Sequence, residues 1–252
     1  MATTTEIPNM PGQNITEFKV LSWNVGGLNT PIKRKKVLDR LRREKAQVIL
    51  LQETHWCRKD KQTLKDKWLQ IVQEASYKTK TRGVAILISK DLPCTLSKTY
   101  KDKNGRYILA DLEIYGIKYT IVNIYAPNNE NKCFFTGVLQ KVDSWGTTNI
   151  ILGGDMNVTW DDFMDKSGKT TAHSKNRARP LHNLCDILQL HDTYRYLHPI
   201  AKDYTFYSGV HKSHSRLDYI FVSRALLPAV STATIGNIDI SDHAQISIKL
   251  KL

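Results

Sequence analysis

Short apolar runs of strand length alternate with helical patterns along the chain, and this alternation limits the fold more than any other feature. The run Val48–Leu51 is typical of a strand buried on both faces. Thr30 and Pro31 have the residue types of a helix start, an N-cap followed by proline at the first helical position. Many strands with interspersed helices predict a layered α/β structure. The sequence contains no internal repeat or low-complexity linker, so we expect one domain.

Apolar or alternating runs predict the strands, and apolar residues spaced three or four apart predict the helices. The strands are expected at Phe18–Trp23, Val48–Leu51, Val84–Ile88, Tyr107–Ile114, Lys118–Ile124, Ile150–Leu152, Thr205–Tyr207, Arg216–Val222 and Gln245–Leu250. The helices are expected from Pro31, around Leu64, Trp68, Ile71 and Val72, over Glu130–Trp145, and around Pro180, Leu181, Leu184 and Leu188. Residues 1–17 lack the apolar core of a signal peptide, so we expect a flexible leader, a folded domain at 18–252 and no secretion.

The chain carries 37 Lys and Arg residues against 24 Asp and Glu residues, a net charge of +13. This excess predicts a polyanionic partner, although charge alone does not distinguish DNA, RNA and an anionic lipid surface. No apolar run approaches membrane-spanning length, so we expect no membrane partner. The cysteines lack the spacing of a zinc site and are expected to be free thiols. They are Cys57, Cys94, Cys133 and Cys185.

Polar residues of catalytic type stand at or just after the ends of the expected strands. They are Asn24, Glu53, Tyr125 and Asp155. In open α/β sheets, ligand sites form where strands end and loops begin, so four such residues predict a shared cleft. Asn157 follows Asp155 at a spacing of two, which places both side chains on one side of an extended chain. Taken alone, this Gly-Gly-Asp stretch is also typical of an ordinary turn.

Glu53 and Asp242 have the chemistry of ligands for a hard cation. Mg²⁺ prefers oxygen, typically from one or two carboxylates together with waters and substrate phosphate. An isolated glutamate at a strand end is more often a plain surface carboxylate. The interpretation of Glu53 as a ligand therefore depends on the residues that accompany it.

Asp218 shares a strand face with the apolar Ile220 and Val222. A carboxylate on such a face is costly unless a cation, a metal or an imidazole partners it. An arginine would serve structurally, but His243 is the sharper candidate because an Asp–His pair fixes the tautomer and raises the basicity of the ring. Asp242 and His243 are adjacent, so both reach one pocket only from a turn. We interpret the remaining histidines as structural.

Six short motifs occur in a fixed order, each weak alone and highly specific together. They are Ser22–Asn29, Gln52–His55, Asn123–Pro127, Gly154–Asn157, Ser215–Ile220 and Ser241–His243. With this set the chain resembles the endonuclease/exonuclease/phosphatase superfamily, and within it the apurinic-endonuclease-like domain of LINE-type (non-LTR) retrotransposons. The resemblance runs from about Phe18 to the C-terminus and includes stretches outside the motifs, such as Gly83–Ile88.

This resemblance implies a DNase I-like four-layer α/β sandwich with two central mixed β-sheets. It also implies a metal-dependent endonuclease domain at 18–252 that nicks double-stranded DNA. The nick exposes a 3′-hydroxyl that primes reverse transcription, and the domain is expected to belong to a larger polyprotein with a reverse transcriptase. The site of action would then be the nucleus.

The resemblance also implies the roles of the metal-site residues. Glu53 is expected to be the main ligand of Mg²⁺, for which Mn²⁺ substitutes, while Asn24 and Asp242 support the metal or its waters. Relatives often carry Asp or Asn at the position of Gly26. Glycine there removes one contact and weakens any assignment of two metals.

The catalytic roles follow from the same resemblance. Asn157 and Tyr125 are expected to hold the scissile phosphate and the attacking water. Asp218 would orient His243, which contacts the phosphate. Asp155 would handle a proton, either as the base for water or as the acid for the leaving oxygen, and Asn24 completes this catalytic set.

The loop Ser208–Ser215 lies where relatives have a hairpin that probes the DNA minor groove. We expect it to tune where the DNA is cut, although a solvated hairpin tip is as frequent an outcome. The residues expected to contact DNA are Thr205, His211, Lys212, Ser213, His214 and Arg216.

Three other functions share this catalytic set. The nearest is an abasic-site DNA repair endonuclease, followed by a phosphatase or sphingomyelinase acting on small or lipid phosphoesters. The third is a catalytically inactive nucleic-acid-binding module. The complete set of acids and histidine argues against an inactive module, and the basic charge argues against a small-molecule phosphatase.

Overall fold

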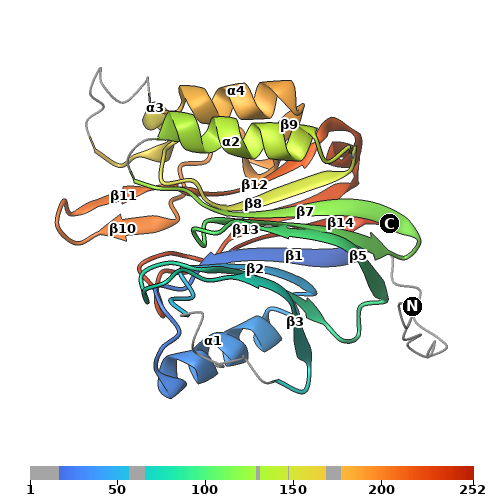
Figure 1. Cartoon of the computed structure of the whole chain (residues 1–252). Coiled ribbons are helices and arrows are strands. Elements are labelled where there is room, and N and C mark those ends of the chain that lie inside the picture. The colour runs from blue at the N-terminus through green and yellow to red at the C-terminus, as the bar shows by residue number, and fades with distance from the viewer. Residues whose placement is uncertain (1–16, 57–65, 129–130, 147, 169–176) are drawn as a thin grey trace.

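The structure is a computed structural model and describes residues 17–56, 66–128, 131–146, 148–168 and 177–252. Two six-stranded mixed β-sheets pack face to face at its centre (Figure 1). The first has the order β13 (Val230–Ile235), β14 (Ile246–Lys251), β1 (Glu17–Asn24), β2 (Val48–Gln52), β4 (Val84–Ser89) and β3 (Leu69–Ala75). The second has the order β5 (Cys94–Lys101), β6 (Tyr107–Ile114), β7 (Ile117–Tyr125), β8 (Ile150–Asp155), β12 (Asp218–Ser223) and β9 (Leu190–Asp192).

Helices cover the outer faces of both sheets and complete four layers. The first sheet is covered by α1 (Pro31–Arg43), and the second by α2 (Asn131–Asp143) and α4 (Arg179–Ile187) (Figure 1). Shorter elements are α3 (Asp162–Asp165), α5 (Thr193–Leu197), the 3₁₀ helix η1 (Arg224–Ala229) and a hairpin of β10 (Phe206–Ser208) and β11 (Ser213–Ser215). The expected DNase I-like α/β sandwich is confirmed.

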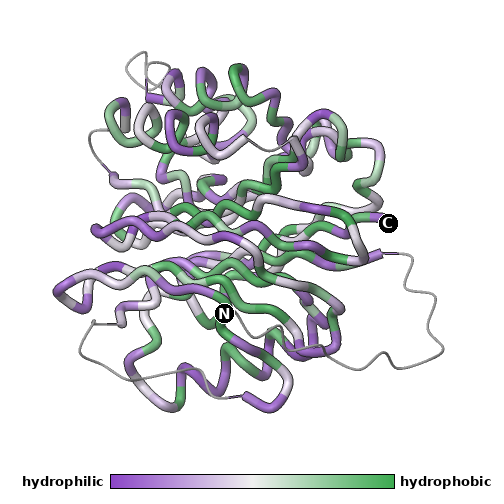
Figure 2. Tube along the Cα trace, turned by 45° about the vertical axis from the view of Figure 1, so that its right-hand side comes forward, coloured by the Kyte–Doolittle hydropathy of each residue, from purple (hydrophilic) through white to green (hydrophobic). Residues whose placement is uncertain are grey.

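Three apolar clusters fill the three spaces between the layers. One lies between the sheets and contains Leu50, Ile121 and Ile220. Another joins α1 to the first sheet, and the third joins α2 and α4 to the second sheet. Figure 2 shows the hydrophobic residues concentrated along the strands and the hydrophilic residues on the periphery. Burying one such aliphatic side chain stabilises the fold by roughly 1.5–3 kcal/mol.

Parallel pairing brings the ends of four strands to one edge of the sandwich. β1 runs parallel to β2, with Asn24 beside Gln52, and β7 runs parallel to β8, with Tyr125 beside Asp155. β12 is antiparallel to β8, so its first residue, Asp218, lies opposite Asp155. The register therefore gathers the polar strand ends at one place.

The helix start at Thr30 and Pro31 is confirmed, because the Thr30 hydroxyl accepts a hydrogen bond from the Lys33 amide. The helix expected around Trp68 and Ile71 is wrong, because this segment forms β3 (Leu64 lies outside the described residues). A β-bulge in β3 shifts its register against β4 between Ile71 and Gln73, and this break in the period of two resembles a helical spacing.

Some strands and loops of the structure differ from those expected from the sequence. β5, β9 and β13 have no counterpart among the expected strands, and the expected loop Ser208–Ser215 contains the second strand of the β10–β11 hairpin. Cys94, Cys133 and Cys185 are free thiols, whereas Cys57 and the leader up to residue 16 lie outside the described residues. Within the described residues, no helix has the length and apolarity needed to cross a membrane.

Candidate active site

A fully buried asparagine joins the two sheets at the edge where the strands end. The Asn24 amide nitrogen donates to Glu53 Oε1 and to Asp155 Oδ2, each at 2.9 Å. Its oxygen accepts from the Gly26 amide at 3.0 Å. Since Glu53 belongs to the first sheet and Asp155 to the second, this one side chain fixes the spacing between two carboxylates that repel each other.

Asp218 and His243 form the expected dyad. Asp218 Oδ2 lies 2.8 Å from His243 Nδ1, and both residues are buried. His243 Nε2 lies 3.8 Å from Asp155 Oδ2 on the other side of the ring. Burial by itself lowers the pKa of His243, but Asp218 and Asp155 outweigh it and raise that pKa to about 10. The ring is therefore an imidazolium at neutral pH, held between two carboxylates.

Asp155 has an unusual acidity for a carboxyl group. Burial raises its pKa to about 7, assisted by the negative charge of Asp218 and opposed by His243 and the Asn24 hydrogen bond. A group with a pKa near 7 both accepts and releases protons at neutral pH, which suits a general acid or base. Its position at the end of β8 requires Gly154, because a Cβ at that glycine would lie 1.9 Å from the Ile124 carbonyl oxygen.

The turn before β14 explains how adjacent residues serve one site. His243 points inward, and its carbonyl accepts a hydrogen bond from the Trp23 indole at 3.1 Å. The ring packs against Phe206, with centroids 4.7 Å apart. Asp242 is exposed on the other side, where the Ser241 hydroxyl donates to its Oδ1 at 3.2 Å. The turn thus sends His243 into the dyad and Asp242 toward solvent.

Glu53 occupies a less enclosed corner of the site. Burial raises its pKa, but hydrogen bonds from His55, Asn24 and Tyr125 outweigh this and lower the pKa to about 2. Its backbone has a φ of 51°, in the left-handed region, which turns the side chain out of the strand direction. The carboxylate is thus ionised, fixed by three neighbours and one quarter exposed, at 24%.

The Glu53 corner fits a divalent metal. Burial lowers the pKa of Lys33, while the carboxylates of Asp242 and Glu53 attract its ammonium and oppose that shift. Carboxylate oxygens open to solvent are the ligands that Mg²⁺ prefers. Asp155, Asp218 and His243 also have ligand atoms within 4.8 Å of one another. There, however, Asp218 already occupies His243 Nδ1 and the ring carries a proton, so we interpret that cluster as proton-holding rather than metal-binding.

Asn157 and Tyr125 lie beside the carboxylates as expected. The Asn157 amide donates to Asp155 Oδ1 at 2.9 Å, and its side chain donates to the Ala126 carbonyl at 2.8 Å. Burial and the charge of Glu53 raise the pKa of Tyr125, so its hydroxyl stays protonated and hydrogen-bonds to Glu53. The Arg106 guanidinium lies over the Tyr125 ring at 4.7 Å.

The sequence interpretation missed three residues of this site. His55 was interpreted as structural, yet its Nε2 lies 3.1 Å from Glu53 Oε2. Its place two residues after Glu53, in the same motif, was the available signal. Arg106 and Lys33 have no residue pattern that indicates a site, and their positions become clear only from the contacts of Arg106 with Tyr125 and of Lys33 with Gly26.

The β10–β11 hairpin projects from the same edge of the sandwich (Figure 1). His211, Lys212 and His214 are exposed on it, and Ser213 is half-buried. The His214 ring packs against Tyr207 with centroids 4.8 Å apart, which stiffens the hairpin across its strands. These four expected DNA-contacting residues therefore stand at the rim of the site.

Two other residues expected to contact DNA are buried instead. The Arg216 guanidinium is 1% exposed and bonds to Asp165 and Asp192. The Thr205 hydroxyl accepts from the amides of Leu217 and Asp218 at 2.9 and 3.1 Å. Both side chains are buried, so neither presents a surface to DNA in this structure, and contact with DNA stays a prediction for them. They hold the base of the hairpin and the start of β12.

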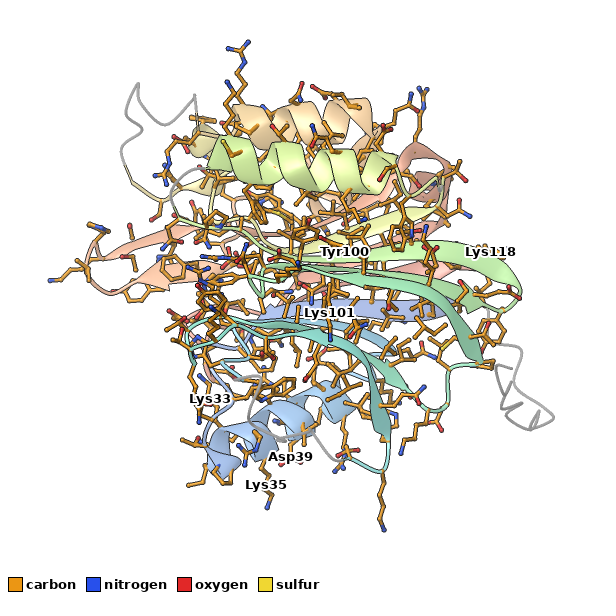
Figure 3. All side chains as sticks on the ribbon, in the orientation of Figure 1. Lys33, Lys35, Asp39, Tyr100, Lys101 and Lys118 are labelled. Carbon is orange, nitrogen blue, oxygen red and sulfur yellow. The ribbon has the colours of Figure 1, made fainter. Side chains whose placement is uncertain are left out.

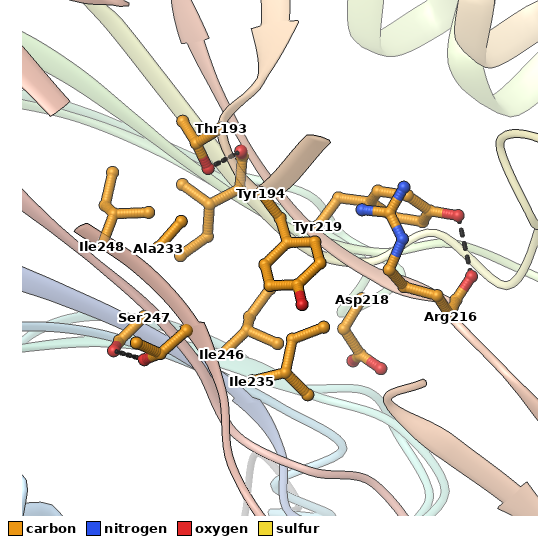
Figure 4. Close-up of a pocket in the computed structure, with 12 residues that line it drawn as sticks. Thr193, Tyr194, Arg216, Asp218, Tyr219, Ala233, Ile235, Ile246, Ser247 and Ile248 are labelled. Carbon is orange, nitrogen blue, oxygen red and sulfur yellow. Dashed lines mark hydrogen bonds between the residues drawn. The ribbon is translucent and has the colours of Figure 1, made fainter. Parts of the chain in front are cut away.

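A narrow pocket beside Asp218 is lined by residues of both sheets (Figure 4). Asp218 and Arg216 line it together with Tyr194 and apolar residues of β13 and β14. Its volume of about 10 Å³ leaves no room for a substrate. This pocket is therefore excluded as a substrate site.

The amino-acid sequence of this chain is similar to those of known nucleases and of a transposon protein. Residues 21–243 match the model of the Endonuclease/Exonuclease/phosphatase family. The chain is 27% identical over 242 residues to the transposon TX1 uncharacterized 149 kDa protein of Xenopus laevis, which covers 93% of this chain and 18% of that protein. It is 28% identical to the DNA repair nuclease APEX1 of Danio rerio, covering 92% of this chain and 82% of the relative.

Solved structures share the fold. The AP endonuclease LMAP from Leishmania major superposes with a TM-score of 0.81 at 20% identity, covering 96% of this chain and 90% of the other. The endonuclease domain of TRAS1, a telomere-specific non-LTR retrotransposon, has a TM-score of 0.69 at 16% identity, covering 93% and 99%. Because the family model spans nearly the whole folded region and includes Asn24, Glu53, Asp155, Asp218 and His243, this chain belongs to the endonuclease/exonuclease/phosphatase family.

Proposed function

We propose that this domain is a Mg²⁺-dependent endonuclease that nicks double-stranded DNA and leaves a 3′-hydroxyl. The observation that carries the proposal is the position of the His243 ring between two carboxylates, 2.8 Å from Asp218 and 3.8 Å from Asp155. It supplies a fixed positive charge and a group that exchanges a proton near pH 7, side by side. Hydrolysis of a phosphodiester needs both.

Each residue then has a distinct task. His243 Nε2 faces Asp155 and is directed toward the phosphate, where its charge stabilises the oxygen that becomes more negative. Asp155 exchanges a proton with water or with the leaving oxygen. The Asp218 carboxylate keeps the His243 ring in place and charged. Asn157 and the Tyr125 hydroxyl provide hydrogen-bonding groups beside the same phosphate.

The metal would be held by Glu53, Asp242 and Asn24. When bound, Mg²⁺ or Mn²⁺ supplies positive charge to the phosphoryl oxygens and orients water. The Glu53 carboxylate is already ionised and fixed before any metal binds, because His55, Asn24 and Tyr125 bond to it. The Glu53 side chain therefore loses little conformational freedom when the metal binds.

Duplex DNA is the substrate that the surface favours. The net charge of +13 matches a polyanion, and the hairpin with exposed His211 and Lys212 stands where it would meet a groove. The likeness to the TX1 protein and to the TRAS1 domain supports a role in a non-LTR retrotransposon. We therefore propose that the nick primes reverse transcription in a larger polyprotein, in the nucleus.

The test is incubation with supercoiled plasmid in Mg²⁺ or EDTA. We expect conversion to nicked circles in Mg²⁺ only, and nicks that a DNA polymerase extends without prior treatment, because the end is a 3′-hydroxyl. Asp155→Asn protein, purified in the same way, is the control for contaminating nucleases. No nicking in Mg²⁺ or Mn²⁺ would contradict the proposal.

The similarity to APEX1 motivates a second candidate, an abasic-site repair endonuclease. A duplex with one abasic analogue separates the two. Cleavage at that position about 100-fold faster than nicking of an intact duplex of equal length would favour repair. Comparable rates on the two duplexes would favour the retrotransposon role.

A further inference from the structure

Lys33 differs from the other lysines at the start of α1. Its ammonium donates to the Gly26 carbonyl at 2.9 Å, and the carboxylates of Asp242 and Glu53 both favour its charged form. Burial outweighs those two carboxylates, so the pKa of Lys33 lies below its ordinary value. Lys35, two residues later, is exposed and has no such surroundings.

Figure 3 shows the same contrast. Lys33 lies at the end of α1 that meets the loops leaving the sheets, whereas Lys35 projects from the helix away from them. The helix start is fixed by the Thr30 cap and Pro31, so the direction of the Lys33 side chain is set by α1 itself.

Gly26 makes room for this ammonium. Its φ is +54°, and a Cβ there would lie 3.4 Å from Lys33 Nζ, 3.6 Å from Asp242 Oδ1 and 3.3 Å from Ser241 Oγ. A side chain at position 26 would therefore project into the space between Lys33 and Asp242. With glycine, that space contains the end of the lysine and no third carboxylate.

Glu53 and Asp242 together form what we call the metal corner. We propose that Lys33 is a positioning residue of this metal corner, whose fixed ammonium weakens divalent-metal binding and limits the corner to one ion. This inference rests on the proposed metal-dependent function. The Lys33 ammonium offsets one of the two negative charges that Glu53 and Asp242 supply, which lessens their attraction for a divalent ion and opposes binding of a second one. Without the ammonium, the same two carboxylates would have a net charge of −2.

The experiment measures Mn²⁺ binding to the DNA-free protein by calorimetry and by electron paramagnetic resonance, which counts bound ions. The variants are Lys33→Met, which keeps the length of the side chain without its charge, and Lys33→Arg, which keeps the charge. Lys35→Met is the matched control, with the same change in net charge on the same helix. Circular dichroism verifies that each variant is folded.

We expect wild-type protein, Lys33→Arg and Lys35→Met to bind one Mn²⁺ with affinities within about twofold of one another. Lys33→Met should bind Mn²⁺ about tenfold more tightly and take up a second ion at millimolar concentrations. Equal effects of Lys33→Met and Lys35→Met, or weaker binding by Lys33→Met, would overturn the role of Lys33 alone. Wild-type protein that binds no Mn²⁺ would overturn the proposed metal dependence and this inference with it.

Discussion

The two corners of the site hold charge in different ways. In the dyad corner, Asp155, Asp218 and His243 are all buried and balance one another inside the protein. In the metal corner, Glu53 is partly exposed and Asp242 is exposed. Buried charges need permanent partners, whereas exposed carboxylates can exchange theirs with solvent. The site therefore combines a buried, internally balanced group of charges with carboxylates open to solvent, which the proposed metal would bind.

The largest expected effect concerns the dyad corner. His243→Ala should reduce the nicking rate by roughly 1000-fold, because it removes the fixed imidazolium that faces the phosphate. His191→Ala, an exposed histidine remote from the site, is the control and should leave the rate unchanged. The measurement is the initial rate of plasmid nicking at saturating Mg²⁺. A loss of less than tenfold for His243→Ala would remove this residue from the chemistry.

Metal titration distinguishes the two corners directly. Glu53→Gln should lower the nicking rate by about 100-fold at low Mg²⁺, because it weakens the binding of an exchangeable metal ion. The rate should recover in part as the Mg²⁺ concentration is raised. Asp218→Asn should not recover at any Mg²⁺ concentration, since it leaves a buried imidazole without its partner. The measurement is nicking rate against Mg²⁺ for both variants. Equal recovery would show that the corners do not differ in this way.

The pH dependence of stability should sharpen the contrast. The folded-state pKa of His243 is raised from 6.5 to about 10, so its contribution is fully present below pH 6.5 and is lost as pH rises through about 10. The folded-state pKa of Asp155 is raised from 3.8 to about 7, so its contribution has the same sign and is lost between those values. We expect the free energy of unfolding to fall with rising pH, by about 1.4 kcal/mol per unit of pKa shift at most.

Denaturant unfolding between pH 4 and 10 checks this dependence. His243→Gln should flatten the decline above pH 6.5, and Asp155→Asn should flatten it below pH 7. Glu53→Gln serves as the contrast, because the pKa of Glu53 is lowered and its contribution is lost only as the pH falls from 4.5 toward 2. Stability that rises from pH 7 to 10 would contradict the charged state assigned to His243.

The smallest expected effect concerns the hairpin rim. Lys212→Ala and His211→Ala should change the overall nicking rate by less than about threefold, because neither side chain reaches the two corners. They should alter which positions are nicked, since a loop in the minor groove responds to its width and deformability. Mapping nicks on one plasmid with wild-type protein and both variants is the measurement. An unchanged map would exclude the hairpin from site selection.

The sequence by itself determined the features that local chemistry imposes. Thr30 and Pro31 fixed the start of α1, and the apolar run Val48–Leu51 fixed a buried strand. Asp218, alone on an apolar face, required a partner, and His243 was the favoured candidate that the structure confirms. The first two inferences succeeded because helix caps and side-chain periodicity act within a few residues, and the need of Asp218 for a partner followed from the cost of a buried charge.

Only the tertiary structure decided which distant groups meet. Arg216 is of the residue type that often contacts DNA, but it is buried in this structure and forms ion pairs with Asp165 and Asp192. A β-bulge made β3 resemble a helix in sequence. Asn24 links the two sheets, and Lys33 lies beside Asp242 across more than 200 positions of chain. Such contacts depend on strand register and layer packing, which no local pattern encodes.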